Sequence, residues 1–128
     1  MRTAKPSKRQ IRNLLTWVKR QIRAHPRKYN QGSFCGTPCC IAGWIDIRLN
    51  GEIAHQLREK HDFWGAASTI AAIANAALGV KEQPALFESY WSGYLHKATT
   101  AMQAARNARE RAEAGCLAID LYMKRRGI

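Results

Sequence analysis

Large apolar residues in this chain recur at helical spacing, and this periodicity restricts its fold more than any other feature. In the segment from residue 8 to residue 24 they fall at i, i+3, i+4 and i+7, so they share one helix face. Ser7 is a suitable N-cap, and His25-Pro26 ends the segment. The apolar face consists of Ile11, Leu14, Leu15, Val18 and Ile22.

Start and stop signals predict further helices along the rest of the chain. We expect Thr37-Pro38 to begin one helix that Asn50-Gly51 ends, and Asp62 to cap another that Gly79 ends. The expected ranges are 38–49, 52–60, 63–78, 81–88 and 98–126. No alternating apolar pattern is long enough for a strand. The sequence therefore predicts an all-α fold, a compact bundle of about five to six helices with a long C-terminal helix. We expect one domain over residues 1–128, with residues 1–7 as a flexible basic tail.

Positive charge is concentrated at the N-terminal end. The first 32 residues contain ten Lys or Arg residues, and the first acidic residue is Asp46. The other 96 residues carry 11 Lys or Arg and nine Asp or Glu, so most of the net charge of +12 belongs to one end. A block of fixed positive charge attracts polyanions and releases their counterions.

The same helical segment carries much of this charge on a face away from its apolar residues. Like charges at i, i+3 and i+4 repel, and the segment contains no acid to relieve them. We therefore expect a protein that binds nucleic acid or a nucleoprotein, largely without sequence preference. The expected nucleic-acid-binding residues are Lys8, Arg9, Arg12, Lys19, Arg20, Arg23, Arg27 and Lys28. A membrane is not an expected partner, because the apolar face belongs to the core.

Residues 18–44 carry a distinctive motif, VKRQIRAHPRKYNQGSFCGTPCCIAGW. The segment resembles a set of small, uncharacterised bacterial and phage proteins that share A-H-P, then Tyr/Trp-Asn/Asp-Gln, then C-G-T-x-x-C-x-A-G-W. The motif positions here include Ala24, His25, Pro26, Tyr29, Asn30, Gln31, Cys35, Gly36, Thr37, Cys40, Ala42, Gly43 and Trp44. Residues 73–91 resemble a second helix pair of the same proteins.

The resemblance implies a helical fold in which the N-terminal helix is integral, and it supplies no catalytic residue. Such proteins tend to carry acids near the A-H-P step, where this chain has Arg23, Arg27 and Lys28. The basic face is therefore expected to be a property of this chain rather than of the group.

The cysteines suggest a third class of function. Cys35 and Cys40 have the spacing of half a zinc site, but a structural zinc site usually needs a second short-spaced pair. The segment before Cys35 also resembles the one before the nucleophile of papain-like proteases, with Phe34 inserted and His25 or His96 as the available bases. Buried structural thiols account for the pattern equally well. The sequence leans against an enzyme, and we assign no catalytic residue, metal site or cofactor.

An aromatic segment near the middle of the chain offers a different partner class. Tyr90, Trp91 and Tyr94 would form a protein-binding patch if they were exposed. This alternative is a phage-encoded interaction module, for instance an inhibitor of a host defence complex, with a homodimer as a further option. The absence of an export signal favours a cytoplasmic protein, in the host cytoplasm if a phage encodes it.

Overall fold

The computed structural model describes residues 5–29, 40–61, 63–88 and 91–128, and within them the side chains of 59, 61 and 63–68 are not described. The described residues form six α-helices and no β-strand. The helices are α1 (Lys8–Ala24), α2 (Ile41–Asn50), α3 (Glu52–His61), α4 (Phe63–Leu78), α5 (His96–Ala104) and α6 (Ala108–Arg126). Short 3₁₀ turns occupy Pro26–Lys28, Ala85–Phe87 and Gly93–Leu95. The predicted all-α bundle with a long C-terminal helix is confirmed.

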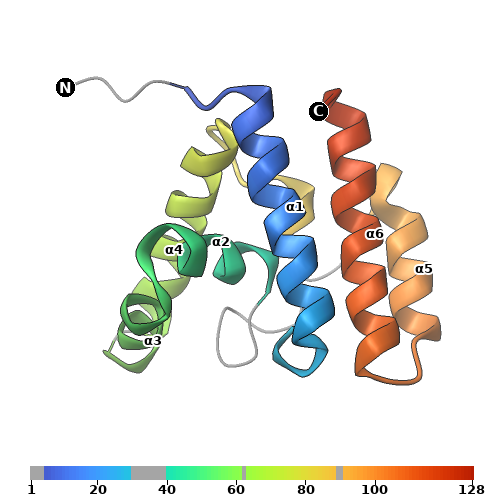
Figure 1. Ribbon diagram of the computed structural model, residues 1–128, viewed down its shortest axis with the longest axis horizontal. Helices are drawn as coiled ribbons and strands as arrows, with labels where there is room; N and C mark the ends of the chain where they lie inside the picture. The colour runs from blue at the N-terminus through green and yellow to red at the C-terminus, as the bar shows by residue number, and fades with distance from the viewer. Residues whose placement is uncertain (1–4, 30–39, 62, 89–90) are drawn as a thin grey trace.

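Helix α1 stands between two groups of helices (Figure 1). Helices α6 and α5 form an antiparallel pair on one side, and α2, α3 and α4 lie on the other. α1 contacts both α6 and α2, and α2 also packs on α4. The N-terminal helix is thus the element that joins the two groups.

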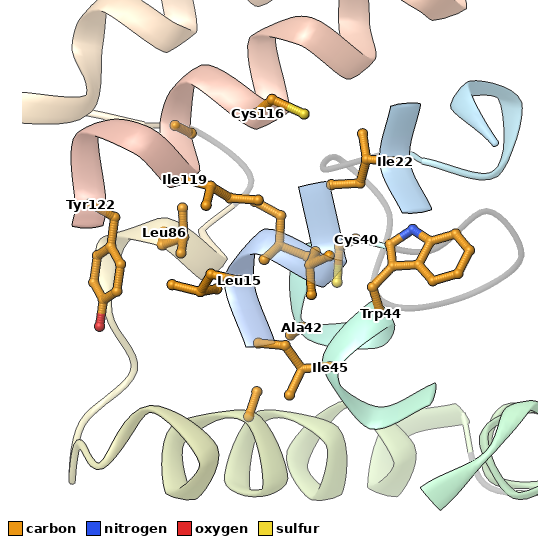
Figure 2. Close-up of a cluster of buried hydrophobic side chains, with 14 of the residues drawn as sticks. Leu15, Ile22, Cys40, Ala42, Trp44, Ile45, Leu86, Cys116, Ile119 and Tyr122 are labelled. Carbon is orange, nitrogen blue, oxygen red and sulfur yellow. The ribbon is translucent and has the colours of Figure 1, made fainter. Parts of the chain in front are cut away.

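The core lies on the inner side of α1. Ile11, Leu15, Val18 and Ile22 are buried, and Leu14 packs against them from the edge. Figure 2 shows Leu15 of α1 in one buried cluster with Ile119 of α6 and Ile45 of α2, and Leu86 lies beside Leu15. Each fully buried aliphatic side chain of this kind stabilises the fold by about 1.5–3 kcal/mol. The predicted apolar face is confirmed.

The ends of α1 and α2 show how local sequence sets the helix boundaries. The Ser7 hydroxyl accepts a hydrogen bond from the Gln10 amide, and the Gln10 side chain accepts one from the Ser7 amide. Gly51 ends α2 with a φ of 90°, a value that suits glycine. α2 begins later than predicted, because Cys40 is in extended backbone before Ile41. Thr37, Pro38 and Asp62 lie outside the described residues.

Two predicted helices are wrong. Instead of the single helix expected over residues 98–126, the structure has two antiparallel helices, α5 and α6. The backbone is extended at Ala105, which ends α5. Asn107 then caps α6, its side chain accepting from the Glu110 amide, while Glu110 accepts from the Arg106 amide. The helix predicted over residues 81–88 is only a 3₁₀ turn at Ala85–Phe87.

Helices α5 and α6 pack against each other through small buried side chains. Ala98 of α5 and Ala112 of α6 are both buried where the two helices pack. Small side chains at such a contact let the axes of two helices approach closely. None of the described helices combines the length and apolar character that crossing a bilayer requires.

Candidate nucleic-acid interface

The outward side of α1 carries four exposed cations, which we call the basic ridge: Lys8, Arg9, Arg12 and Arg20. Within the described part of the chain, none of the four forms an ion pair. The first turn of α1 contains no acid. The expectation of a cationic face without acidic partners therefore holds along this ridge of the described structure.

Two other cations of the same helix differ, and here the expectation is wrong. Lys19 Nζ lies 2.6 Å from Asp120 Oδ1, and Arg23 donates to both carboxylate oxygens of Glu113 at 2.9 and 3.1 Å. We call Lys19 and Arg23 the paired flank. The hydrogen bonds that Arg23 donates to Glu113 raise the pKa of Arg23, although its guanidinium is about half exposed.

Tertiary packing creates these pairs. α6 runs antiparallel to α1, so acids distant in sequence stand beside the lower half of α1. The same seam brings Cys116 against α1, where its thiol donates to the Lys19 carbonyl oxygen at 3.7 Å. No pattern within residues 8–24 could have revealed acids contributed by positions 113 and 120.

The last two predicted cations follow α1 in the 3₁₀ turn. Lys28 Nζ is 3.9 Å from Glu52 Oε1, a loose pair between exposed groups that contributes little. Arg27 is exposed and lines a pocket of about 860 Å³ beside the start of α6, together with Arg109 and Arg111. The pocket's arginines come from both ends of the chain, which is why the sequence pattern did not group them.

Tyr29 follows this turn, and its ring packs closely against the α6 backbone at Gly115. A Cβ at Gly115 would lie 2.6 Å from the Tyr29 hydroxyl and ring, so only glycine leaves room there. Burial, assisted by the nearby Cys40 and Cys116 thiols, raises the pKa of Tyr29 well above its ordinary value. The tyrosine therefore stays neutral and fixes the exit of α1 on the middle of α6.

Aromatic rings flank the other side of α1. Trp17 and Trp44 meet edge to face with their centroids 6.3 Å apart, and the His25 ring stacks on Trp44 at 6.1 Å. The Arg48 guanidinium lies 5.4 Å from the Trp17 ring centroid. The buried Trp44 Nε1 has no hydrogen-bond partner among the described residues. These rings join α1 to α2, as expected of core anchors; nothing is described for the Trp64 side chain.

A buried polar cluster, which we call the Asp46 cluster, was missed by the sequence analysis. Asp46 of α2 is fully buried and accepts from Asn50 at 2.8 Å, from His55 Nδ1 at 2.8 Å and from Arg58 at 3.0 and 3.2 Å. The His55 ring is buried as well. The His55 proton is assigned to Nδ1, because an ionised carboxylate can only accept.

The partners of Asp46 decide its ionisation. Burial favours the neutral acid, but the hydrogen bonds from Arg58, His55 and Asn50 outweigh it and lower the pKa of Asp46. The charged carboxylate thus ties α2 to α3. An Asp–His pair also orients a general base in some enzymes. Two of the motif thiols, Cys35 and Cys39, lie outside the described residues.

Two of the four cysteines belong to the described residues. Cys40 and Cys116 are buried. Burial raises the pKa of the Cys116 thiol to about 11, so it is unreactive at neutral pH. The described residues contain no group of three or more His, Cys, Asp or Glu residues that could hold a metal ion.

The aromatic patch predicted as a partner surface is not a continuous exposed patch. Trp91 is buried and donates from Nε1 to the Leu86 carbonyl oxygen at 3.1 Å, so this part of the prediction is wrong. Tyr94 is on the surface, with the Arg125 guanidinium 5.3 Å from its ring centroid. Tyr90 lies outside the described residues. The most exposed large aliphatic side chains are elsewhere, on α2 and α3: Leu49, Ile53 and Leu57.

Comparison with known proteins adds no relative. No protein-family model matches the chain, no curated protein matches it, and no solved structure matches it.

Proposed function

We propose that this protein binds nucleic acid through the basic ridge of α1, contacting phosphates and reading little sequence. The supporting observation is the contrast on one helix between two cations that have acidic partners and four that have none among the described residues. A phosphate backbone would neutralise the second group without breaking any ion pair of the fold.

The unpaired state of the ridge is unfavourable for the free protein. Arg12 stands three positions from Arg9 and four from Lys8, where like charges destabilise a helix by about 0.2–0.5 kcal/mol per pair. This repulsion is not relieved by Glu113 or Asp120, because these acids pair with the cations of the paired flank. A bound polyanion removes the repulsion, which is a reason for the ridge to remain cationic.

The length of the ridge suits a nucleic-acid backbone. From Lys8 to Arg20 the helix rises about 18 Å, close to five base-pair steps of a duplex. Arg27 and Lys28 extend the positive surface past the end of α1. Lys19 and Arg23 have a secondary role in this proposal, because a phosphate would compete with Asp120 and Glu113 for them.

A gel-shift panel with duplex and single-stranded DNA and RNA, repeated across a salt series, tests the proposal. The test variant is Arg9→Gln/Arg12→Gln/Arg20→Gln. The matched control is Lys60→Gln/Lys81→Gln/Lys97→Gln, which removes the same charge from exposed residues outside α1. We expect the ridge variant to lose most binding while the control keeps most of it. Equal losses in the two variants would show only a non-specific effect of net charge, and the proposed site would be wrong.

A further inference from the structure

The pocket beside the start of α6 combines three features of a phosphate site. Its volume is about 860 Å³, and its lining includes Arg27 from the turn after α1 and Arg109 and Arg111 from the first turn of α6. None of the lining residues that the structure describes is acidic. Three arginines from two distant segments thus line one concave surface.

The acids nearest in sequence are already used by other cations. Glu110 is 3.5 Å from the Arg106 guanidinium and also accepts from the Arg106 amide at 3.1 Å. Glu113 is held by Arg23. Within the described structure, Arg27, Arg109 and Arg111 form no ion pair, so their guanidinium groups are available to an external anion. Guanidinium groups bind phosphate oxygens with charge-assisted, often paired, hydrogen bonds.

The backbone at the pocket adds to the arginines. Asn107 caps α6, and its side chain accepts from the Glu110 amide at 2.9 Å. The amides of Ala108 and Arg109 belong to the first turn, where no intrahelical acceptor exists, and both residues line the pocket. The positive end of a 19-residue helix therefore faces the same space.

One residue of the lining is itself buried in the fold. Tyr29 lines the pocket while remaining buried, because its ring sits against Gly115. The volume lies within the range of about 300–1,000 Å³ that small-molecule sites occupy, which leaves room for more than a phosphate alone.

We propose that this pocket binds the phosphomonoester group of a nucleotide, with Arg27, Arg109 and Arg111 holding its oxygens. Two sources present that chemistry, a free mononucleotide and the 5′ end of a nucleic-acid strand. The site is separate from the basic ridge and does not require it: it uses α6 and the turn after α1, whereas the ridge lies along α1.

The first arm of the test compares adenosine 5′-monophosphate with adenosine, which differ only in the phosphate. Titration is followed by calorimetry and by the NMR amide signals of Ala108 and Arg109. We expect the monophosphate to bind at least roughly tenfold more tightly than adenosine, with the two amide signals shifting. The variant Arg109→Gln/Arg111→Gln should weaken its binding by about tenfold or more, whereas Lys81→Gln/Lys97→Gln, with the same loss of charge, should not.

The second arm separates the two sources. Oligonucleotides with a 5′-phosphate and with a 5′-hydroxyl are compared in the wild-type protein and in the two variants. A preference for the phosphorylated strand that Arg109→Gln/Arg111→Gln abolishes identifies a strand end, and no preference, with monophosphate binding intact, identifies a free nucleotide. If adenosine 5′-monophosphate and adenosine bind alike, or if both double variants weaken monophosphate binding equally, the pocket is not a phosphate site. That result leaves the ridge proposal standing, because the ridge is tested by its own variant.

Discussion

The basic ridge of α1 and the Asp46 cluster are both sets of charged groups, but they differ in burial and in pairing. Asp46 is fully buried, and every contact that holds it is a hydrogen bond from a side chain of α2 or α3. The ridge cations are exposed, and among the described residues they have no acidic partner. The first region stabilises the fold, and the second is open to a ligand.

The physical reason is the cost of desolvation. A buried carboxylate is tolerated only with several donors, so its neighbours must be arranged by the fold. An exposed guanidinium stays hydrated and needs no partner for the protein to fold. Removing Asp46 should therefore damage stability, and removing ridge cations should damage binding.

The largest effect is expected from Asp46→Ala. The change leaves His55, Arg58 and Asn50 without their acceptor, and breaking a buried pair from one side costs about 3–5 kcal/mol. Chemical denaturation measures the loss, with Asp120→Ala as the control in an exposed pair. A loss as small as that of the control would abolish the distinction between the two regions.

The next effect concerns binding and should leave stability unchanged. We expect Arg9→Gln/Arg12→Gln/Arg20→Gln to weaken nucleic-acid affinity by roughly 100-fold at low salt and to reduce the slope of log K against log salt by about 2–3. The melting temperature should stay constant or rise slightly, because like-charge repulsion is removed. A large fall in melting temperature would mean that the ridge is structural.

Acid should weaken the Asp46 cluster in a defined pH range. The pKa of Asp46 is lowered in the folded state, so its contribution to stability is fully present above the ordinary value of 3.8 and is lost as pH falls through the lower folded value. Denaturation curves from pH 6 down to about 2 for the wild type and Asp46→Asn measure this difference. The two proteins should converge at the acid end, and curves that stay parallel throughout would contradict the assignment.

The smallest effect is expected from the paired flank. A double-mutant cycle with Lys19→Gln and Asp120→Asn should give a coupling free energy of about 0.2–1 kcal/mol, because Asp120 is half exposed. Raised salt should reduce the coupling. A coupling of several kcal/mol would mean that the Lys19–Asp120 pair stabilises the fold as strongly as the buried Asp46 cluster does.

The sequence was most informative where a signal is local. Ser7 and the spacing of Ile11, Leu15 and Ile22 defined α1, and Gly51 and Gly79 marked the ends of α2 and α4. The predicted helix over residues 98–126 was wrong because the two adjoining segments, now α5 and α6, both favour helix. Nothing in the alanine spacing across residues 98–112 shows a break, although Asn107 followed three residues later by Glu110 is a helix-start signal that indicates the turn at Ala105.

The candidate site divides in the same way. Helical periodicity placed the cations on α1, and composition showed an excess of positive charge. The sequence did not distinguish Lys19 and Arg23 from Arg12 and Arg20. It also gave no sign that Arg27 meets Arg109 and Arg111, or that His55 is buried beside Asp46. Each of these facts depends on which residues of one helix stand beside which residues of another.

The sequence by itself determined the helices with clear caps, the buried face of α1 and the surplus of cations at one end, because periodicity, capping and net charge are properties of neighbouring residues. The tertiary structure alone decided which cations are neutralised, since an ion pair or a pocket requires atoms within a few ångströms across helices. Antiparallel packing of α1 on α6 supplies that proximity at Asp120 and Glu113 and leaves the ridge, in the described structure, facing solvent.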